Sequence, residues 1–314
     1  MTAKPKILVQ GTFPDAFRSA LAARFDLVAH DPAVPPAEAK GWDKSIRGLV
    51  SWARLAVTRE MMDRLPGLEI VAGFGVGYDR FDLAAAKDKG VVVTNTPDVL
   101  TDDVADIAVG LMIAASRRIA TLDRFVRAGR WAAGEVPAMA RKVTGKKLGI
   151  AGLGRIGRAI ARRAESFEMK ISYTGPRAYA DVAYAFVPDL VALARESDFL
   201  VIACRADPET RHMVNADVLK ALGAKGILVN IARGSMVDEA ALVQALKDGM
   251  LGGAGLDVFA DEPRAPAELF AIDNVVLTPH VASATVETRT AMGDLVIANL
   301  ESHFAGKGPL TPVE

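Results

Sequence analysis

Three side chains late in the sequence could bind an anionic substrate and donate a proton to it. They are Arg233, Glu262 and His280. An imidazole can give a proton to a ketone oxygen while hydride reaches the carbon, because its pKa lies near neutrality. A neighbouring carboxylate would fix its tautomer and favour the imidazolium form. A guanidinium can hold a substrate carboxylate and polarise the adjacent carbonyl. Taken singly, His280 could be structural, Glu262 could belong to a turn and Arg233 could cap a helix.

A glycine-rich turn earlier in the chain predicts a nucleotide beside these groups. The apolar run 148–151 ends in a G-x-G-x-x-G segment that opens a helical pattern. The segment comprises Gly152, Leu153, Gly154, Arg155, Ile156 and Gly157. Its first glycine permits the tight turn, the second lets a pyrophosphate approach the backbone, and the third brings the helix close to the strand. The helix amino terminus would then face the phosphates with unpaired N–H groups.

The end of the next strand indicates which dinucleotide binds. NAD-binding turns carry an acidic residue there that accepts both ribose hydroxyls, but no Asp or Glu occurs from Lys170 to Ala180. Gly175 does not repel a 2′-phosphate, Arg177 can pair with one, and Thr174 offers a hydroxyl. The sequence therefore favours NADP(H), with NAD(H) possible at lower preference. Alternatively, Arg177 is a solvated loop charge.

The elements that must position these groups form an alternating α/β pattern. Expected strands are 7–9, 27–29, 49–51, 70–72, 91–94, 148–151, 171–174, 199–203, 227–230, 253–256 and 275–278, and expected helices include 14–24, 59–65, 102–120 and 286–304. Parallel strands place their carboxyl ends on one edge of a sheet, where ligands bind, so the loops that carry the three side chains could surround one cleft. Thr101 is a plausible N-cap of helix 102–120.

This order of elements predicts two domains. A Rossmann-type doubly wound parallel sheet would span 100–284 and bind the dinucleotide. A discontinuous, flavodoxin-like substrate domain would combine 1–99 with 285–314, because helix 286–304 lies beyond the last strand of the second set. The 314 residues suffice for two cores of ordinary size.

Composition narrows the partners and the compartment. Formal net charge is +0 and the pI is about 6.9, so no bulk field favours nucleic acid or an anionic membrane. Cys204 is the single cysteine, which excludes disulfides within the chain and is typical of a reducing compartment. No signal peptide and no apolar run long enough to span a membrane is apparent. We expect a cytoplasmic protein without a metal site.

Six segments resemble the D-isomer-specific 2-hydroxyacid dehydrogenase family. They are Gly73–Asp79, Asn95–Asp106, Gly152–Gly157, Asn230–Gly234, Gly255–Phe259 and Thr278–Ser283. Asn95–Asp106 and the segment Pro309–Val313 look most similar to the hydroxypyruvate/glyoxylate reductase branch, which typically uses NADPH. The resemblance implies reduction of small 2-oxo acids, glyoxylate and hydroxypyruvate, to (R)-2-hydroxy acids.

The resemblance also implies roles for individual residues. Arg233, Glu262 and His280 match the family's Arg–Glu–His set, with His280 as proton donor. Val76 and Gly77 match the loop that holds the substrate carboxylate, and Ser283 lies in the motif that follows His280. On the cofactor side, Asp257 matches a residue that faces the nicotinamide carboxamide, with the backbones of Cys204 and Ile231 nearby. Helix 102–120 and the arm that contains Trp131 match the region that forms homodimers.

Departures from the family pattern leave several roles open. Glu168 stands where Gly is usual. Arg205 replaces a Pro or small residue and is either a second contact to NADP phosphates or an exposed charge. Arg54 could hold a second anionic group and Trp52 could narrow the pocket, or both could be surface residues. Alternatives to the reductase are an NAD-linked D-lactate or phosphoglycerate-type dehydrogenase and, from another class, a dinucleotide-sensing binding protein similar to co-repressors.

Overall fold

The chain folds into two compact units. The computed structural model describes residues 4–313. One unit contains the chain up to Leu100 together with the segment from Ser283 onward, and the other is Thr101–Ala282. The boundaries expected from the sequence, after residues 99 and 284, lie within two residues of these.

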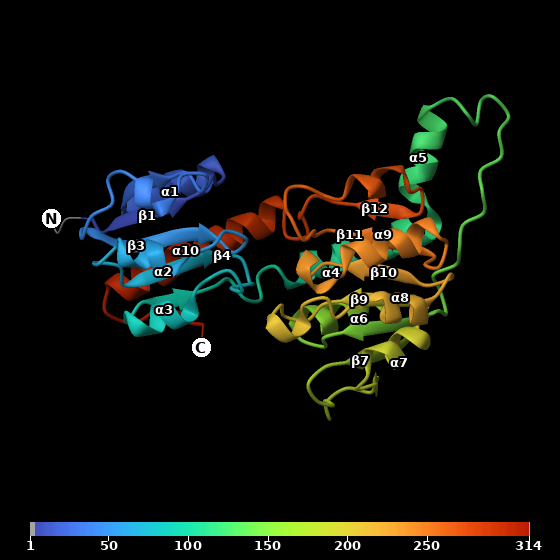
Figure 1. Cartoon of the computed structure of the whole chain (residues 1–314). Coiled ribbons are helices and arrows are strands. Elements are labelled where there is room, and N and C mark those ends of the chain that lie inside the picture. Colours follow the sequence, from blue (N-terminus) through green and yellow to red (C-terminus); the bar gives the residue numbers. More distant parts are fainter. Residues whose placement is uncertain (1–3, 314) are drawn as a thin grey trace. The chain divides into compact units, whose positions relative to one another are not determined.

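The first unit is built on a five-stranded parallel sheet of order β2-β1-β3-β4-β5 (Figure 1). Its strands are β1 Lys6–Gln10, β2 Asp26–His30, β3 Ile46–Trp52, β4 Ile70–Phe74 and β5 Val92–Thr94. Its helices are α1 Asp15–Arg24, α2 Arg59–Asp63, α3 Leu83–Asp88 and α10 Val286–Phe304, with a 3-10 turn η1 at Pro36–Glu38. The chain moves from β1 to β2 in one direction along the sheet and from β3 to β5 in the other. Because both crossovers are right-handed, α1 lies on one face of the sheet and α2 with α3 on the other.

Helix α10 completes this unit although it comes from the far end of the chain. Thr285 caps it by accepting a hydrogen bond from the N–H of Thr288 at 3.1 Å. A Cβ built on Gly293 would lie 2.7 Å from the Phe17 ring, so the glycine lets α10 pack closely against α1. The side-chain oxygen of Asn299 accepts from the N–H of Leu310 at 2.9 Å and thereby holds the returning C-terminal segment. The first unit is thus discontinuous in sequence, as expected.

The second unit contains a seven-stranded parallel sheet of order β12-β11-β10-β9-β6-β7-β8 (Figure 1). Its strands are β6 Lys147–Ala151, β7 Lys170–Thr174, β8 Ala185–Phe186, β9 Phe199–Ile202, β10 Ile227–Asn230, β11 Gly253–Leu256 and β12 Val275–Leu277. Its helices are α4 Thr101–Arg117, α5 Ile119–Arg127, α6 Arg155–Glu165, α7 Leu190–Arg195, α8 Ala216–Leu222 and α9 Glu239–Lys247, with 3-10 turns η2 Pro208–Thr210, η3 Gly234–Met236 and η4 Ala267–Ala271. This arrangement confirms the predicted fold class.

The strand order of the second unit reverses between β6 and β9. Strands added after β6 extend the sheet one way, and those added after β9 extend it the other way. Open α/β sheets bind ligands outside the carboxyl ends of the strands at such a switch point. Gly152 directly follows β6, and Cys204 lies two residues beyond β9, so the glycine-rich turn occupies this position.

The expected helix 102–120 is wrong in one respect, because it is two helices. Arg118 adopts a left-handed conformation with φ 56° and separates α4 from α5. The first helix also begins at Thr101 itself rather than after it. The short strand β8 was not expected; two residues give too little periodicity to detect.

Glu168, the departure noted after α6, takes φ 55° in the place where the family usually has Gly. The left-handed position is therefore retained without glycine, at the modest steric cost of a Cβ in this region.

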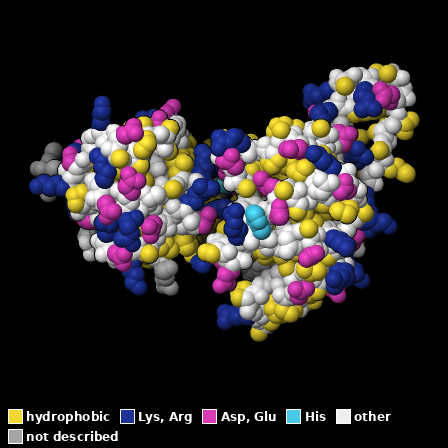
Figure 2. Space-filling model, in the orientation of Figure 1, with side chains coloured by type: hydrophobic (Ala, Val, Ile, Leu, Met, Phe, Trp, Pro, Cys, Tyr) yellow, Lys and Arg dark blue, Asp and Glu magenta, His cyan; other side chains and the backbone are white. Residues whose placement is uncertain are grey.

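In the part of the chain that the structure describes, no helix is long and apolar enough to cross a membrane. Figure 2 shows Lys and Arg side chains interspersed with Asp and Glu over the visible face, in keeping with their equal numbers of 38 and 38.

Candidate active site

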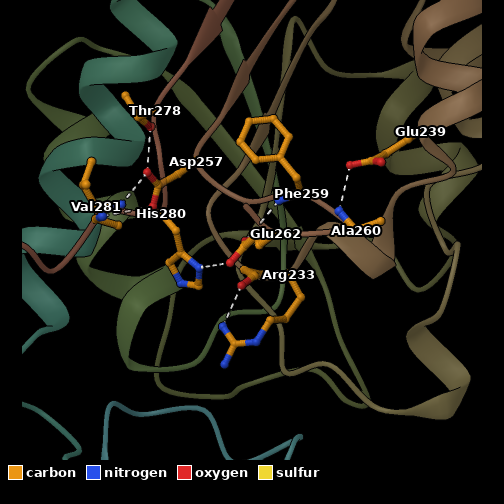
Figure 3. A network of polar contacts seen from close by, with 11 residues as sticks. Arg233, Glu239, Asp257, Phe259, Ala260, Glu262, Thr278, His280 and Val281 are labelled. Carbon is orange, nitrogen blue, oxygen red and sulfur yellow. Dashed lines mark hydrogen bonds and ion pairs between the residues drawn. The ribbon is translucent and has the colours of Figure 1, made fainter. Parts of the chain in front are cut away.

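The three late side chains come together in the second unit. Arg233 follows β10, Glu262 follows β11 and His280 follows β12, so neighbouring parallel strands deliver them to one edge of the sheet. In Figure 3 the imidazole, the carboxylate and the guanidinium lie beside one another. Had they been scattered, the catalytic interpretation would have failed.

His280 and Glu262 form a direct pair. The Nδ1 atom of His280 lies 2.7 Å from Oε2 of Glu262, and the two side chains are 26% and 23% exposed. The other carboxylate oxygen accepts from the N–H of Phe259 at 3.2 Å. Burial disfavours the charged form of Glu262, but the hydrogen bond and charge of His280, with the charge of Arg233, outweigh it and lower the pKa of Glu262. The acid is therefore an ionised partner that directs the histidine's Nε2 away from itself.

Arg233 is held by its own loop. Its Nη1 donates to the carbonyl of Ala232 at 2.8 Å, and its carbonyl accepts from the Asn230 side-chain amide at 2.9 Å. The side chain is half-buried and close enough to Glu262 for its positive charge to favour the carboxylate. A guanidinium in this position can bind an anion beside the imidazole.

Asp257 supports the loop that carries His280. Its side chain is 0% exposed. Its carboxylate accepts from the Thr278 hydroxyl at 2.7 Å and from the N–H groups of Val281 and Ala282, both at 2.9 Å (Figure 3). The carbonyl of Asp257 also accepts from the N–H of His280 at 2.8 Å. In this structure Asp257 positions the histidine, and its expected contact with a cofactor stays a prediction.

The backbone of His280 adopts a left-handed conformation with φ 54°. Non-glycine residues rarely do so, and such conformations cluster at functional sites, where the surrounding contacts enforce them. The hydrogen bonds that Asp257 accepts from this loop are those contacts. The sequence pattern carried no signal of this conformation.

The glycine-rich turn fits a dinucleotide on steric grounds. Gly152 has φ 97°, and a Cβ there would lie 2.5 Å from the Cα of Cys204. A Cβ on Gly157 would lie 2.1 Å from the carbonyl oxygen of Gly152, so both positions require glycine. The Cβ position of Gly154 has no neighbour within 4 Å, which leaves the backbone at the start of α6 open to a phosphate group. Arg155 is exposed and Ile156 half-buried in the first turn of that helix.

The loop after β7 contains the residues that we expect to distinguish NADP(H) from NAD(H). Gly175 has no atom within 4 Å of its Cβ position, and Arg177 is exposed. The Thr174 side chain, in contrast, is 7% exposed, and its hydroxyl donates to the carbonyl of Pro188 at 3.1 Å. The Thr174 hydroxyl is thus engaged within the loop, and its predicted contact with a phosphate stays a prediction, whereas Arg177 is an exposed cation.

The remaining cofactor-side residues surround the switch point. Ile231 is buried after β10, and Arg205 is exposed after β9. Burial raises the pKa of the Cys204 thiol to about 11, and its Sγ lies 3.7 Å from Sδ of Met213. Cys204 is thus a neutral packing group rather than a nucleophile. Among the described residues no group of three or more His, Cys, Asp and Glu is arranged to hold a metal ion.

In the first unit, the loop with Val76 and Gly77 is tightly fixed. The side-chain amide of Asn95 donates to the carbonyl of Val76 at 2.8 Å, and the Thr96 hydroxyl accepts from the N–H of Gly75 at 3.1 Å. Val76 and Gly77 are half-buried. A rigid loop can present its N–H groups to a carboxylate with little loss of entropy.

Trp52 and Arg54 lie near this loop, because Trp52 pairs with Phe74 in the β3–β4 register. The indole N–H donates to the carbonyl of Thr12 at 2.8 Å, which fixes the ring. The Arg54 guanidinium carbon lies 5.2 Å from the centroid of that ring, and that of Arg289 lies 4.7 Å from it. Ser283, the first residue of the returning segment, is half-buried.

Sequence reasoning missed two residues of these surroundings. Arg289 lies inside helix α10, where nothing in the local pattern distinguishes it from a surface charge. Glu239 begins α9 and accepts from the N–H of Ala260 at 2.8 Å (Figure 3), and burial raises its pKa. Only the tertiary structure brings it to the loop that contains Glu262.

Comparisons with known proteins agree with the fold. The family model "D-isomer specific 2-hydroxyacid dehydrogenase, NAD binding domain" matches residues 109–282. The chain belongs to the D-isomer specific 2-hydroxyacid dehydrogenase family.

Individual relatives lie within the reductases of this family. The chain is 55% identical over 269 residues to glyoxylate/hydroxypyruvate reductase A of Arabidopsis thaliana, covering 86% of each protein. It is 44% identical over 313 residues to 2-ketogluconate reductase of Gluconobacter oxydans, covering 100% of both. The NADPH-dependent glyoxylate/hydroxypyruvate reductase of Sinorhizobium meliloti, solved in complex with NADP and malonate, matches with a TM-score of 0.94 and 43% identity over 99% of this chain and 97% of that one.

Proposed function

We propose that the protein is an NADPH-dependent reductase that converts glyoxylate and hydroxypyruvate to the (R)-2-hydroxy acids. The observation that carries the proposal is the 2.7 Å pairing of His280 with Glu262 beside Arg233, in the unit that also contains the glycine-rich turn. The relatives named as glyoxylate/hydroxypyruvate reductases support the choice of substrate.

The residues have complementary roles in this proposal. NADPH, when bound, supplies the hydride. Arg233 binds the 2-oxo acid and polarises its carbonyl, which stabilises charge as it develops on the oxygen. His280 donates the proton to that oxygen from Nε2, because Nδ1 is engaged by Glu262. Glu262 stays ionised and fixes the orientation of the ring through its contact with Nδ1.

The cofactor is held by residues of the second unit. Gly152, Gly154 and Gly157 shape the turn, with Arg155 and Ile156 in the helix start that faces the pyrophosphate. Arg177 pairs with the 2′-phosphate, and Gly175 leaves space for it. Arg205 is a second phosphate contact, and the backbones of Cys204 and Ile231 with Asp257 lie on the nicotinamide side. NAD(H) is accepted less well, because no acid within 170–180 is available for the ribose hydroxyls.

We assign the substrate carboxylate to the N–H groups of Val76 and Gly77, whose loop is fixed by Asn95 and Thr96. Arg54 holds a polar or anionic group at the other end of the substrate, and Ser283 adds a hydroxyl. The contact of Arg54 with the Trp52 ring orients its guanidinium. Because 2-ketogluconate reductase matches the whole chain, a longer polyhydroxy 2-oxo acid is the second candidate substrate.

A panel of kcat/KM values on glyoxylate, hydroxypyruvate, pyruvate, phenylpyruvate and 2-ketogluconate, each with NADPH and NADH, tests the proposal. We expect the highest values with NADPH and glyoxylate or hydroxypyruvate, and Arg177→Asp should move the preference toward NADH. Turnover of pyruvate with NADH alone would support the D-lactate-type alternative. Dinucleotide binding without turnover of any 2-oxo acid would support the binding protein.

We also propose that the protein forms a homodimer in the cytoplasm. The segment around α5 exposes large apolar side chains: Ile119, Val126, Trp131, Val136 and Met139 are 51%, 52%, 68%, 89% and 96% exposed. We call this segment, residues 119–139, the arm; hydrophobic side chains (yellow) are visible on it in Figure 2. Several large apolar side chains exposed on one short segment are typical of a contact between subunits. The single cysteine supports a reducing compartment.

A further inference from the structure

The loop after β7 is reached by a second arginine that the sequence does not single out. Arg158 lies on α6 directly after the glycine-rich turn. Its guanidinium carbon is 4.9 Å from the centroid of the Tyr179 ring, and that of Arg177 is 5.9 Å from the same centroid. Two cations from different elements therefore converge on one aromatic side chain, each gaining a cation–π contact.

Tyr179 is anchored to the core of the unit. Its backbone N–H donates to the hydroxyl of Tyr173 at 2.7 Å, and the two ring centroids lie 5.9 Å apart. Tyr173 belongs to β7 and is 1% exposed. The ring of Tyr179 is thus a fixed platform beside the carboxyl end of β7, where the adenosine ribose of a dinucleotide binds in this fold.

The Arg158 guanidinium already holds an anion. Its two terminal nitrogens donate to the two carboxylate oxygens of Asp181 at 2.8 and 3.0 Å. A phosphate monoester offers a guanidinium the same pair of oxygens with a larger charge. Asp181 is 68% exposed whereas Arg158 is 28% exposed, and a pair open to solvent on the acid side contributes little to stability and can separate.

Asp181 is also the first acidic residue after β7, directly beyond residues 170–180, which contain no Asp or Glu. In an NAD-binding protein such an acid would accept the ribose hydroxyls. Here its two oxygens are directed to Arg158, and this hydrogen bond holds the pKa of Asp181 below its ordinary value. It is therefore an ionised partner of the arginine rather than an acceptor for ribose.

We propose that Arg158 and Arg177 together bind the 2′-phosphate of the nucleotide, with Tyr179 as their platform and Asp181 as an internal competitor that leaves Arg158 when the phosphate arrives. The ligand class is a nucleotide with a 2′-phosphomonoester. This inference rests on the proposed function only for the identity of the cofactor as NADP(H). Arg158 would be a determinant of specificity that acts from the helix, not from the loop.

Binding of 2′,5′-ADP and of 5′-AMP to the full-length protein, measured by calorimetry, isolates the 2′-phosphate. We expect Arg158→Gln to weaken 2′,5′-ADP about tenfold, the worth of one charge-assisted pair, and to leave 5′-AMP nearly unchanged. Arg158→Lys should fall in between, because it keeps the charge but loses the bidentate geometry. Asp181→Asn should tighten 2′,5′-ADP and leave 5′-AMP unchanged.

Arg162→Gln is the matched control. Arg162 is an exposed arginine one turn further along the same helix, so its replacement removes the same charge and should change neither affinity appreciably. Thermal melts of each variant exclude loss of folding as a cause. Equal weakening of both nucleotides by Arg158→Gln, or no weakening, overturns the proposal. Weaker 2′,5′-ADP binding in Asp181→Asn overturns the competitor role, because Asp181 would then hold Arg158 in place.

The readout is independent of turnover. If the wild-type protein shows the expected nucleotide pattern but reduces no 2-oxo acid, the proposed function fails and this phosphate site stands. If it reduces glyoxylate with NADPH but Arg158→Gln leaves the 2′,5′-ADP to 5′-AMP ratio unchanged, the site fails and the function stands.

Discussion

At the scale of single residues, the catalytic proposal depends on His280 and on the groups that hold it. Its ring is fixed from one side by Glu262, and its backbone is fixed in a left-handed conformation by Asp257. The His280 ring is therefore oriented before substrate binds, and substrate binding has to order it little further.

Replacing His280 by Ala should lower kcat for glyoxylate reduction by about 10²–10⁴, the usual contribution of a positioned proton donor. Fluorescence titration with NADPH should give an almost unchanged Kd, since His280 is assigned to the reacting oxygen and not to the dinucleotide. Near-normal turnover would mean that another group donates the proton.

Glu262→Gln should reveal the lowered pKa of Glu262 in the pH dependence of stability. A carboxyl whose pKa is lower in the folded than in the unfolded state stabilises the fold above its unfolded value of about 4.3. That stabilisation is lost as the pH falls through the lowered folded value. The difference in unfolding free energy between wild type and variant, from urea titrations, should therefore be largest near neutral pH and shrink below about pH 4. A difference independent of pH would show that the pairing is not ionic.

At the scale of elements, the glycine-rich turn combines two requirements that can be separated. Gly157 is needed for packing of α6 on the turn, whereas Gly154 has open space where its Cβ would be. Gly157 is therefore required for folding and Gly154 for ligand binding, although both belong to the same motif.

The matched pair Gly157→Ala and Gly154→Ala tests this separation. Gly157→Ala should lower the unfolding free energy by about 1–3 kcal/mol, the usual effect of overpacking. Gly154→Ala should leave the melting temperature almost unchanged and weaken NADPH binding, because its methyl group would occupy the path of the pyrophosphate. Equal effects of the two substitutions on stability would contradict the assignment.

At the scale of the whole molecule, the chain consists of two units, one of which is closed by the C-terminal helix, and it carries an exposed apolar arm. The arm begins where Arg118 ends α4 in a left-handed conformation. An apolar surface of this kind is costly to leave in water, which favours its burial against a second copy.

Trp131→Glu should convert the dimer to a monomer, because it would bury a charge in the subunit contact. Light scattering coupled to size-exclusion chromatography measures the mass directly. Leu310→Glu is the control: Leu310 is also apolar and 57% exposed, but it lies in the C-terminal segment of the first unit, outside the arm, and should leave the mass unchanged. A monomeric wild-type protein would refute the homodimer.

The sequence by itself determined the class of fold, most strand positions and the three loops that bear Arg233, Glu262 and His280. It could do so because apolar runs and glycine spacing are local signals, and parallel strands deliver their carboxyl ends to one edge. Only the tertiary structure decided the break at Arg118, the burial of the Thr174 hydroxyl, the support of His280 by Asp257 and the convergence of Arg158 with Arg177 on Tyr179. Those features depend on contacts between residues far apart in the sequence and on local backbone conformations. The hydrophobic periodicity of a single segment predicts neither of them.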